Sequence, residues 1–175
     1  MALIKKVRGF EPQIGKGCYL AETAVVIGDT VLGEGCSVWF NTVIRGDVNS
    51  IRVGNNVNIQ DGSVLHTLYE KSQIHIGNNV SIGHNVTIHG ATIKDNVLVG
   101  IGAVVLDNVV IGENCIIAAN SVVLTGTQIE PNSLYAGIPA KKVKDIEPRH
   151  TQDLIQRISD NYSMYASWYK EDDSY

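Results

Sequence analysis

The sequence predicts an all-β solenoid, in which short parallel strands wind into successive coils, followed by one C-terminal helix. Three observations carry this prediction. Aliphatic side chains recur every six residues, and a small or β-branched residue stands four positions after nearly every one of them. The 175 residues also include 17 glycines but only 6% aromatics. In such repeats each coil buries its inward side against the coils above and below it.

The aliphatic anchors fall into four blocks of regular spacing. A slip of three residues follows Ile44, an insertion of five follows Leu65, and one residue is lost after Ile88. Nineteen of the twenty anchors are Ile, Val or Leu, whereas composition alone would fill roughly six of them. The anchors are Ile14, Leu20, Val26, Leu32, Val38, Ile44, Val53, Ile59, Leu65, Ile76, Ile82, Ile88, Ile93, Val99, Val105, Ile111, Ile117, Val123, Ile129 and Tyr135.

The small residues four positions later share the parity of the anchors, so on a strand they face the same side. We expect both sets to point inward. Cys18, Cys36 and Cys115 all occupy this small position, which indicates packing rather than chemistry, and three distant cysteines make no disulfide framework. The other members are Ala24, Thr30, Thr42, Val48, Val57, Ser63, Val80, Val86, Thr92, Val97, Ala103, Val109, Ser121, Thr127 and Ser133.

The pattern over residues 11–145 resembles the hexapeptide-repeat family of left-handed parallel β-helices. In that family three six-residue units form one triangular coil of about eighteen residues, so twenty units imply about seven coils. The left hand is implied by the family and not by the spacing, because the general crossover rule favours the right hand. We expect residues 1–146 to form this β-helix domain.

The pattern changes after Asp145. Leu154, Ile155, Ile158, Tyr162, Tyr165 and Tyr169 follow helical spacing behind Pro148. We therefore expect an amphipathic helix over about 150–170, within a segment 147–175 that packs back on the coils.

The net charge and the lack of long apolar runs restrict the kinds of partner and the location that we expect. Fourteen Lys and Arg against 18 Asp and Glu give a net charge of −4, which argues against nucleic acid and anionic membranes. No apolar run is long enough to span a bilayer, and the first residues lack the apolar stretch of a signal peptide. We expect a cytoplasmic protein.

Three of the five histidines indicate a metal site. His66 and His89 follow anchors in the third unit of successive coils, so the two imidazoles stack about 4.8 Å apart. His84 lies one unit earlier, about 16 Å away at about 3.3 Å per residue, too far to share an ion within one chain. A neighbouring β-helix could supply it. His75 and His150 are expected at the surface.

Four motifs surround these histidines: Arg45-Gly46-Asp47, Asn58-Ile59-Gln60-Asp61-Gly62, Leu65-His66 and Gly83-His84-Asn85-Val86-Thr87-Ile88-His89-Gly90. In this order and spacing the sequence resembles the γ-class carbonic anhydrase family, specifically its compact bacterial branch. The resemblance implies a homotrimer with one Zn²⁺, or in some members Fe²⁺ or Co²⁺, at each subunit interface. His66 and His89 would come from one subunit and His84 from its neighbour.

The resemblance also implies roles for residues around the metal. Arg45 and Asp47 would pair across the interface and shape the pocket; an exposed ion pair is the alternative. Gln60 would orient the attacking hydroxide, Asn58 would contact substrate, and Asp61 would support the interface or serve only its turn.

Two further positions bear on turnover. Tyr162 resembles a tyrosine that reaches the site in compact members, and helix packing explains it equally well. Well-studied members carry a Glu where this chain has Val48, and more acidic residues in the loop where it has Glu70 alone, the candidate proton relay.

The expected activity is the reversible hydration of CO₂ to bicarbonate, because three neutral imidazoles leave open positions on Zn²⁺ and the metal lowers the pKa of bound water toward about 7. One alternative is a CoA-dependent acyltransferase, which many hexapeptide-repeat proteins are. The other is a non-catalytic metal-binding or scaffold protein.

Overall fold

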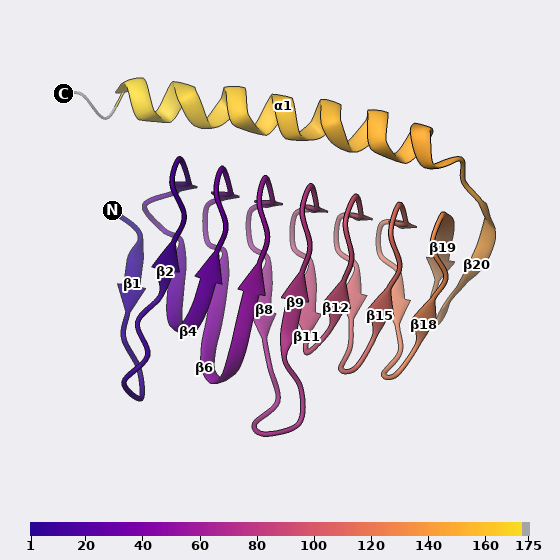
Figure 1. Ribbon diagram of the computed structural model, residues 1–175, viewed down its shortest axis with the longest axis horizontal. Coiled ribbons are helices and arrows are strands. Elements are labelled where there is room, and N and C mark those ends of the chain that lie inside the picture. Colours follow the sequence, from indigo (N-terminus) through magenta and orange to yellow (C-terminus); the bar gives the residue numbers. More distant parts are fainter. Residues whose placement is uncertain (173–175) are drawn as a thin grey trace.

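The computed structural model describes residues 1–172 and confirms a left-handed parallel β-helix of about seven turns with one C-terminal helix (Figure 1). Short strands in successive turns pair in parallel and form a triangular prism with three faces, named A, B and C in the order in which each turn from β3 onward visits them. Apart from the first and last strands, neighbours within a face come from successive turns, so each residue lies above its counterpart one turn earlier.

Face A is an eight-stranded sheet that ends in the antiparallel pair of β19 and β20. Its strands are β3 (Tyr19–Leu20), β5 (Ser37–Val38), β7 (Asn58–Ile59), β10 (Ser81–Ile82), β13 (Leu98–Val99), β16 (Ile116–Ile117), β19 (Ser133–Gly137) and β20 (Ala140–Asp145).

Faces B and C form one twelve-stranded sheet, because the long strands β4 and β6 bend from one face into the other. Face B contains β1 (Leu3–Lys5), the first parts of β4 (Val25–Leu32) and β6 (Val43–Val53), β8 (Val64–His66), β11 (Thr87–His89), β14 (Val104–Val105) and β17 (Val122–Val123). Face C contains β2 (Gln13–Ile14), the second parts of β4 and β6, β9 (Ile74–Ile76), β12 (Thr92–Ile93), β15 (Val110–Ile111) and β18 (Gln128–Ile129).

The anchors form the core as predicted. Seventeen of the twenty are buried, and the three exceptions, Ile14, Leu20 and Tyr135, are partly buried and pack against the core near the two ends of the prism. The small positions line the same interior in the regular turns. Burial of aliphatic surface is therefore continuous along the prism axis and stabilises it without any metal.

Two of the predicted inward positions were wrong. Val48 and Thr92 are only partly buried, and Thr92 pairs in register with the outward-facing His75. Ile51 and Ala91, both fully buried, face inward in their place. The cause lies in the breaks of the repeat: the slip after Ile44 and the residue lost after Ile88 each change the phase, so counting four from the anchor selects an outward side chain.

The helix α1 (Pro148–Asp172) confirms the expected amphipathic helix, and residues 173–175 of the expected terminal segment lie outside the described residues. The helix runs the length of the prism, so that its C-terminal end lies over the first turns (Figure 1). It contacts β5 and β10 of face A. No helix within residues 1–172 is long and apolar enough to cross a membrane.

Candidate metal centre

His66 and His89 lie at the corner where face B turns into face C, the B/C corner. His66 and His89 are paired in register on β8 and β11, as predicted, and Arg45 on β6 is paired in register with His66. His66 Nδ1 is 3.3 Å from His89 Nε2. Two nitrogens bound to one tetrahedral zinc at about 2.0–2.1 Å stand about 3.3–3.4 Å apart. The spacing of the two imidazoles therefore fits two ligands of one ion.

Asp47 holds the opposite side of His66. The Arg45 guanidinium Nη1 lies 2.7 Å from Asp47 Oδ2, and His66 Nε2 donates to Asp47 Oδ1 over 3.3 Å. Burial alone would raise the pKa of Asp47, but the hydrogen bond and charge of Arg45 lower it below its ordinary value. Burial and the charge of Arg45 lower the pKa of His66. His66 is therefore a neutral imidazole near pH 7, the form that binds a metal.

Asp107 was missed from the sequence. It begins the corner turn after β14, one turn beyond His89, and its Oδ2 accepts a 2.9 Å hydrogen bond from His89 Nδ1. Ser72, from the insertion between β8 and β9, donates to Asp107 Oδ1 over 2.6 Å. No repeat signal marks either residue, because Ser72 lies in the irregular insertion and Asp107 is an ordinary turn residue by type.

His84 lies at a different corner, where face A turns into face B, the A/B corner. Asn85, in the left-handed conformation with φ 55°, makes the turn directly after it. His84 Nδ1 lies 2.8 Å from Asp61 Oδ2, and its Nε2 lies 3.5 Å from the hydroxyl of Tyr162 on α1. Burial and the nearby Asp61 raise the pKa of Tyr162 to about 12, so the phenol stays protonated.

Asn58 and Gln60 form a buried polar network near the A/B corner with a third residue, Ser81, that was also missed. Gln60 Nε2 donates to Asn58 Oδ1 over 2.9 Å and to Ser81 Oγ over 3.3 Å, while Ser81 donates to Asn58 Oδ1 over 2.8 Å. Asn58 and Ser81 are paired in register on adjacent strands of face A. This network fixes the amide of Gln60, and its Oε1 is the atom that it can present as an acceptor.

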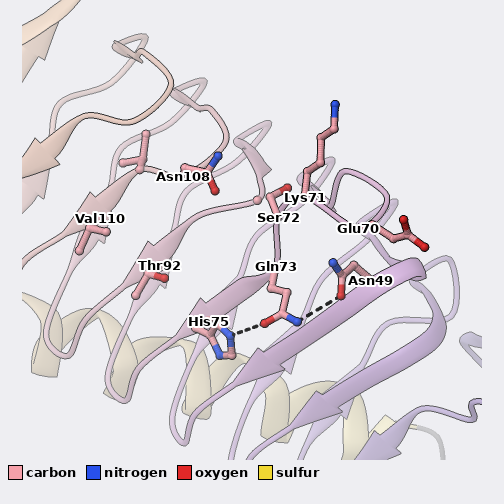
Figure 2. A pocket seen from close by; sticks show the side chains of 11 residues that line it. Asn49, Glu70, Lys71, Ser72, Gln73, His75, Thr92, Asn108 and Val110 are labelled. Atoms are coloured by element: carbon pink, nitrogen blue, oxygen red, sulfur yellow. Dashed lines mark hydrogen bonds between the residues drawn. The ribbon is translucent and has the colours of Figure 1, made fainter.

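Gln60 and Tyr162 also line a common pocket of about 400 Å³ between face A and α1. Glu70 lies on the exposed loop after His66, apart from both sets of residues. It lines a separate groove of about 440 Å³ with Lys71, Gln73 and His75 (Figure 2).

The predicted residues thus separate into two groups on one chain. The B/C corner holds Arg45, Asp47, His66 and His89, and the A/B corner holds Asn58, Gln60, Asp61, His84 and Tyr162. Within residues 1–172 no set of three His, Cys, Asp or Glu side chains is placed to hold a metal ion. Each corner brings together at most two of the three histidines.

Comparisons with known proteins agree with this architecture. A family model described as "Dynactin subunit 5" matches residues 13–169. A solved structure from Bacillus cereus, a putative acetyltransferase, superposes with a TM-score of 0.91 at 36% identity and covers 97% of this chain and 98% of that one.

Relatives with similar sequences show which family of hexapeptide-repeat proteins this chain belongs to. A probable carbonic anhydrase of Methanocaldococcus jannaschii is 46% identical over 93% of this chain and 99% of its own length. Gamma carbonic anhydrase 1 of Arabidopsis thaliana is 34% identical over 89% of this chain and 58% of its own length. With this identity across nearly the whole β-helix, the chain belongs to the γ-class carbonic anhydrase family of hexapeptide-repeat proteins.

Proposed function

We propose that this chain forms a homotrimer whose interfaces bind Zn²⁺, with Fe²⁺ or Co²⁺ as alternatives, and that it hydrates CO₂ reversibly. One observation carries the proposal: each of the three histidines has a carboxylate at one ring nitrogen, and the other ring nitrogen faces away from that carboxylate, toward the second histidine in His66 and His89 and toward the Tyr162 hydroxyl in His84. The pairs are His66 with Asp47, His84 with Asp61, and His89 with Asp107. Metal-binding histidines almost always donate their other ring N–H to a carboxylate, a backbone carbonyl or water.

The trimer follows from the position of the two corners. Both border face B, whose outward surface carries the in-register row Val43, Val64, Thr87, Val104 and Val122. Val64 is 37% exposed in the single chain. When three parallel prisms turn face B toward a threefold axis, the A/B corner of each meets the B/C corner of the next. His84 of one subunit then joins His66 and His89 of another.

The chemistry needs a metal and a polar pocket. A bound zinc ion lowers the pKa of water toward about 7 and supplies a nucleophile for CO₂. Gln60 is held by Asn58 and Ser81, so its Oε1 would be available to accept a hydrogen bond from the nucleophile and orient it toward CO₂. The Tyr162 hydroxyl, which stays protonated, lines the same pocket as Gln60. Cys18, Cys36 and Cys115 are in the reduced form, which fits our proposal of a cytoplasmic protein.

The test combines metal analysis with stopped-flow measurement of CO₂ hydration. We expect about one zinc per chain and hydration that His89→Ala abolishes, whereas His150→Ala, a substitution on the exposed start of α1, leaves both unchanged. A metal-loaded trimer without hydration would refute the enzyme and leave the non-catalytic metal protein. A preparation that binds no zinc, iron or cobalt would refute the metal site.

An acyltransferase is the second candidate, favoured by the structural match to a putative acetyltransferase. It predicts binding of acetyl-CoA in calorimetry. We expect no acetyl-CoA binding, since the three carboxylate-backed histidines serve a metal and not an acceptor hydroxyl.

A further inference from the structure

The insertion that breaks the repeat after His66 places a buried serine, Ser72, at the B/C corner. Its residues leave face B after β8 and return to face C at β9, and they make a tight turn in which the Leu68 amide donates to Ser72 Oγ over 3.0 Å. Ser72 is only 4% exposed. The next residue, Gln73, hydrogen-bonds to Asn49 and His75 and ties the end of the loop to face C (Figure 2).

Ser72 completes a chain of three hydrogen bonds that ends on His89. The Leu68 amide donates to Ser72, Ser72 donates to Asp107 Oδ1 over 2.6 Å, and His89 Nδ1 donates to Asp107 Oδ2 over 2.9 Å. An ionised carboxylate only accepts hydrogen bonds. Because both oxygens of Asp107 are engaged, the proton of His89 must reside on Nδ1, which leaves Nε2 unprotonated and facing His66.

Gly90 provides the room for this chain. A Cβ atom built at Gly90 would lie 2.1 Å from Ser72 Oγ and 2.4 Å from Asp107 Oδ1, distances that side chains do not tolerate. Its φ of 66° also falls in the left-handed region that favours glycine. The residue directly after His89 is therefore one that leaves space for the contact between Ser72 and Asp107.

We propose that Asp107 and Ser72 are positioning residues that hold His89 in the Nδ1–H tautomer with Nε2 aimed at the metal, and that the 67–73 loop, which contains the insertion, places Ser72 beside Asp107. This inference rests on the proposed metal site for its consequence, but the tautomer itself is a property of the metal-free chain. The loop and the ligand are thereby coupled: a change in the loop alters the orientation of His89 although no loop residue binds the ion.

The first experiment reads the tautomer directly. Metal-free protein labelled with ¹⁵N-histidine is measured by NMR at about pH 8.5, about two units above the ordinary histidine pKa, and His89 is assigned from its loss in His89→Gln. Wild type should show the Nδ1–H form. Asp107→Ala should show a mixture of both tautomers, and Asp107→Asn should favour Nε2–H, because its Oδ1 still accepts from Ser72 while its Nδ2 amide then donates toward His89 Nδ1. An Nε2–H form in wild type, or no change in Asp107→Ala, would overturn the inference.

The second experiment measures zinc affinity by competition with a chromophoric chelator. Asp107→Ala should weaken binding by about 10- to 100-fold, Asp107→Asn by a similar factor because it favours the wrong tautomer, and Ser72→Ala by less. Asp95→Ala is the matched control, since Asp95 also sits at a corner and accepts a 2.8 Å bond from the Asn78 amide, away from the histidines. It should leave affinity unchanged.

These outcomes separate the two proposals. If wild type binds zinc and Asp107→Ala binds it equally well, the positioning role is wrong and the metal site stands. If wild type binds no metal, the proposed function fails, and the NMR result alone decides the tautomer. Equal losses of affinity in Asp107→Ala and Asp95→Ala, with parallel falls in the melting temperature, would show a purely structural effect and overturn the inference.

Discussion

Trp39 is the residue on which the docking of α1 most depends. It is 5% exposed, and its ring packs against Tyr19, Tyr162, Tyr169 and Phe40 at centroid distances of 5.1, 5.2, 5.8 and 6.3 Å. Trp39→Ala removes all four contacts. A buried Trp truncated to Ala costs about 3–5 kcal/mol, and the loss should fall on the helix interface.

The loss should be local, because the solenoid core contains only residues of the prism. Hydrogen exchange followed by mass spectrometry should therefore show faster exchange across 148–169 and unchanged exchange in β11 and β12, which belong to faces B and C. Trp168→Ala is the matched control: Trp168 is 52% exposed and contacts only Tyr165 among the ring pairs described for residues 1–169. It should cost less than about 1 kcal/mol. Equal protection of α1 in Trp39→Ala and wild type, or a uniform loss over the prism, would refute this reasoning.

Four further predictions concern the core and the site. Ile88→Ala, at a fully buried anchor in the middle of the prism, should lower the free energy of unfolding by about 2–5 kcal/mol in urea titrations. The hydrogen bond with Cys18 and burial raise the pKa of the Cys36 thiol above its ordinary value of 9.0. The contribution of this thiol to the free energy of unfolding is therefore complete below pH 9 and is lost as the pH rises, by up to about 1.4 kcal/mol per pH unit. Cys36→Ala should reduce this loss of stability at alkaline pH in melting curves. Turnover in dilute buffer should be slow and rise strongly with added imidazole, since Val48 and the exposed Glu70 offer no relay comparable to the family's, and Val48→Glu should reduce that dependence in stopped-flow assays. Removal of metal by a chelator should leave the sedimentation of the trimer unchanged, because the cores form without it.

The regular part of this structure could be predicted because the number of residues in each turn fixes which side chains lie above one another in successive turns. Once the anchors are counted, His66 and His89 must stack, and the structure pairs them in register. The same counting fails beside the breaks in the repeat, where Val48 and Thr92 turn outward and Ile51 and Ala91 replace them.

The unpredicted residues share another cause. Asp107 and Ser72 are 35 residues apart and meet only because an irregular loop folds under the corner, and Ser81 gains its role from the neighbour on β7. Ser and Asp are ordinary turn and strand residues, so their type carries no signal. The pairing of each of the three histidines with a carboxylate can be recognised only in the three-dimensional structure of the corners.

The central claim is that each metal site takes His66 and His89 from one chain and His84 from another, and mixed trimers test it most directly. His84→Ala and His66→Ala chains, each tagged differently, are coexpressed and the zinc content is measured by mass spectrometry. Each parent alone should bind no zinc. Any trimer that contains both chains has one interface where an intact His84 faces an intact His66 and His89, so a random mixture should recover about one quarter of the wild-type zinc per chain. Mixed trimers that recover none would show that the three ligands do not come from two chains, and the account would be wrong.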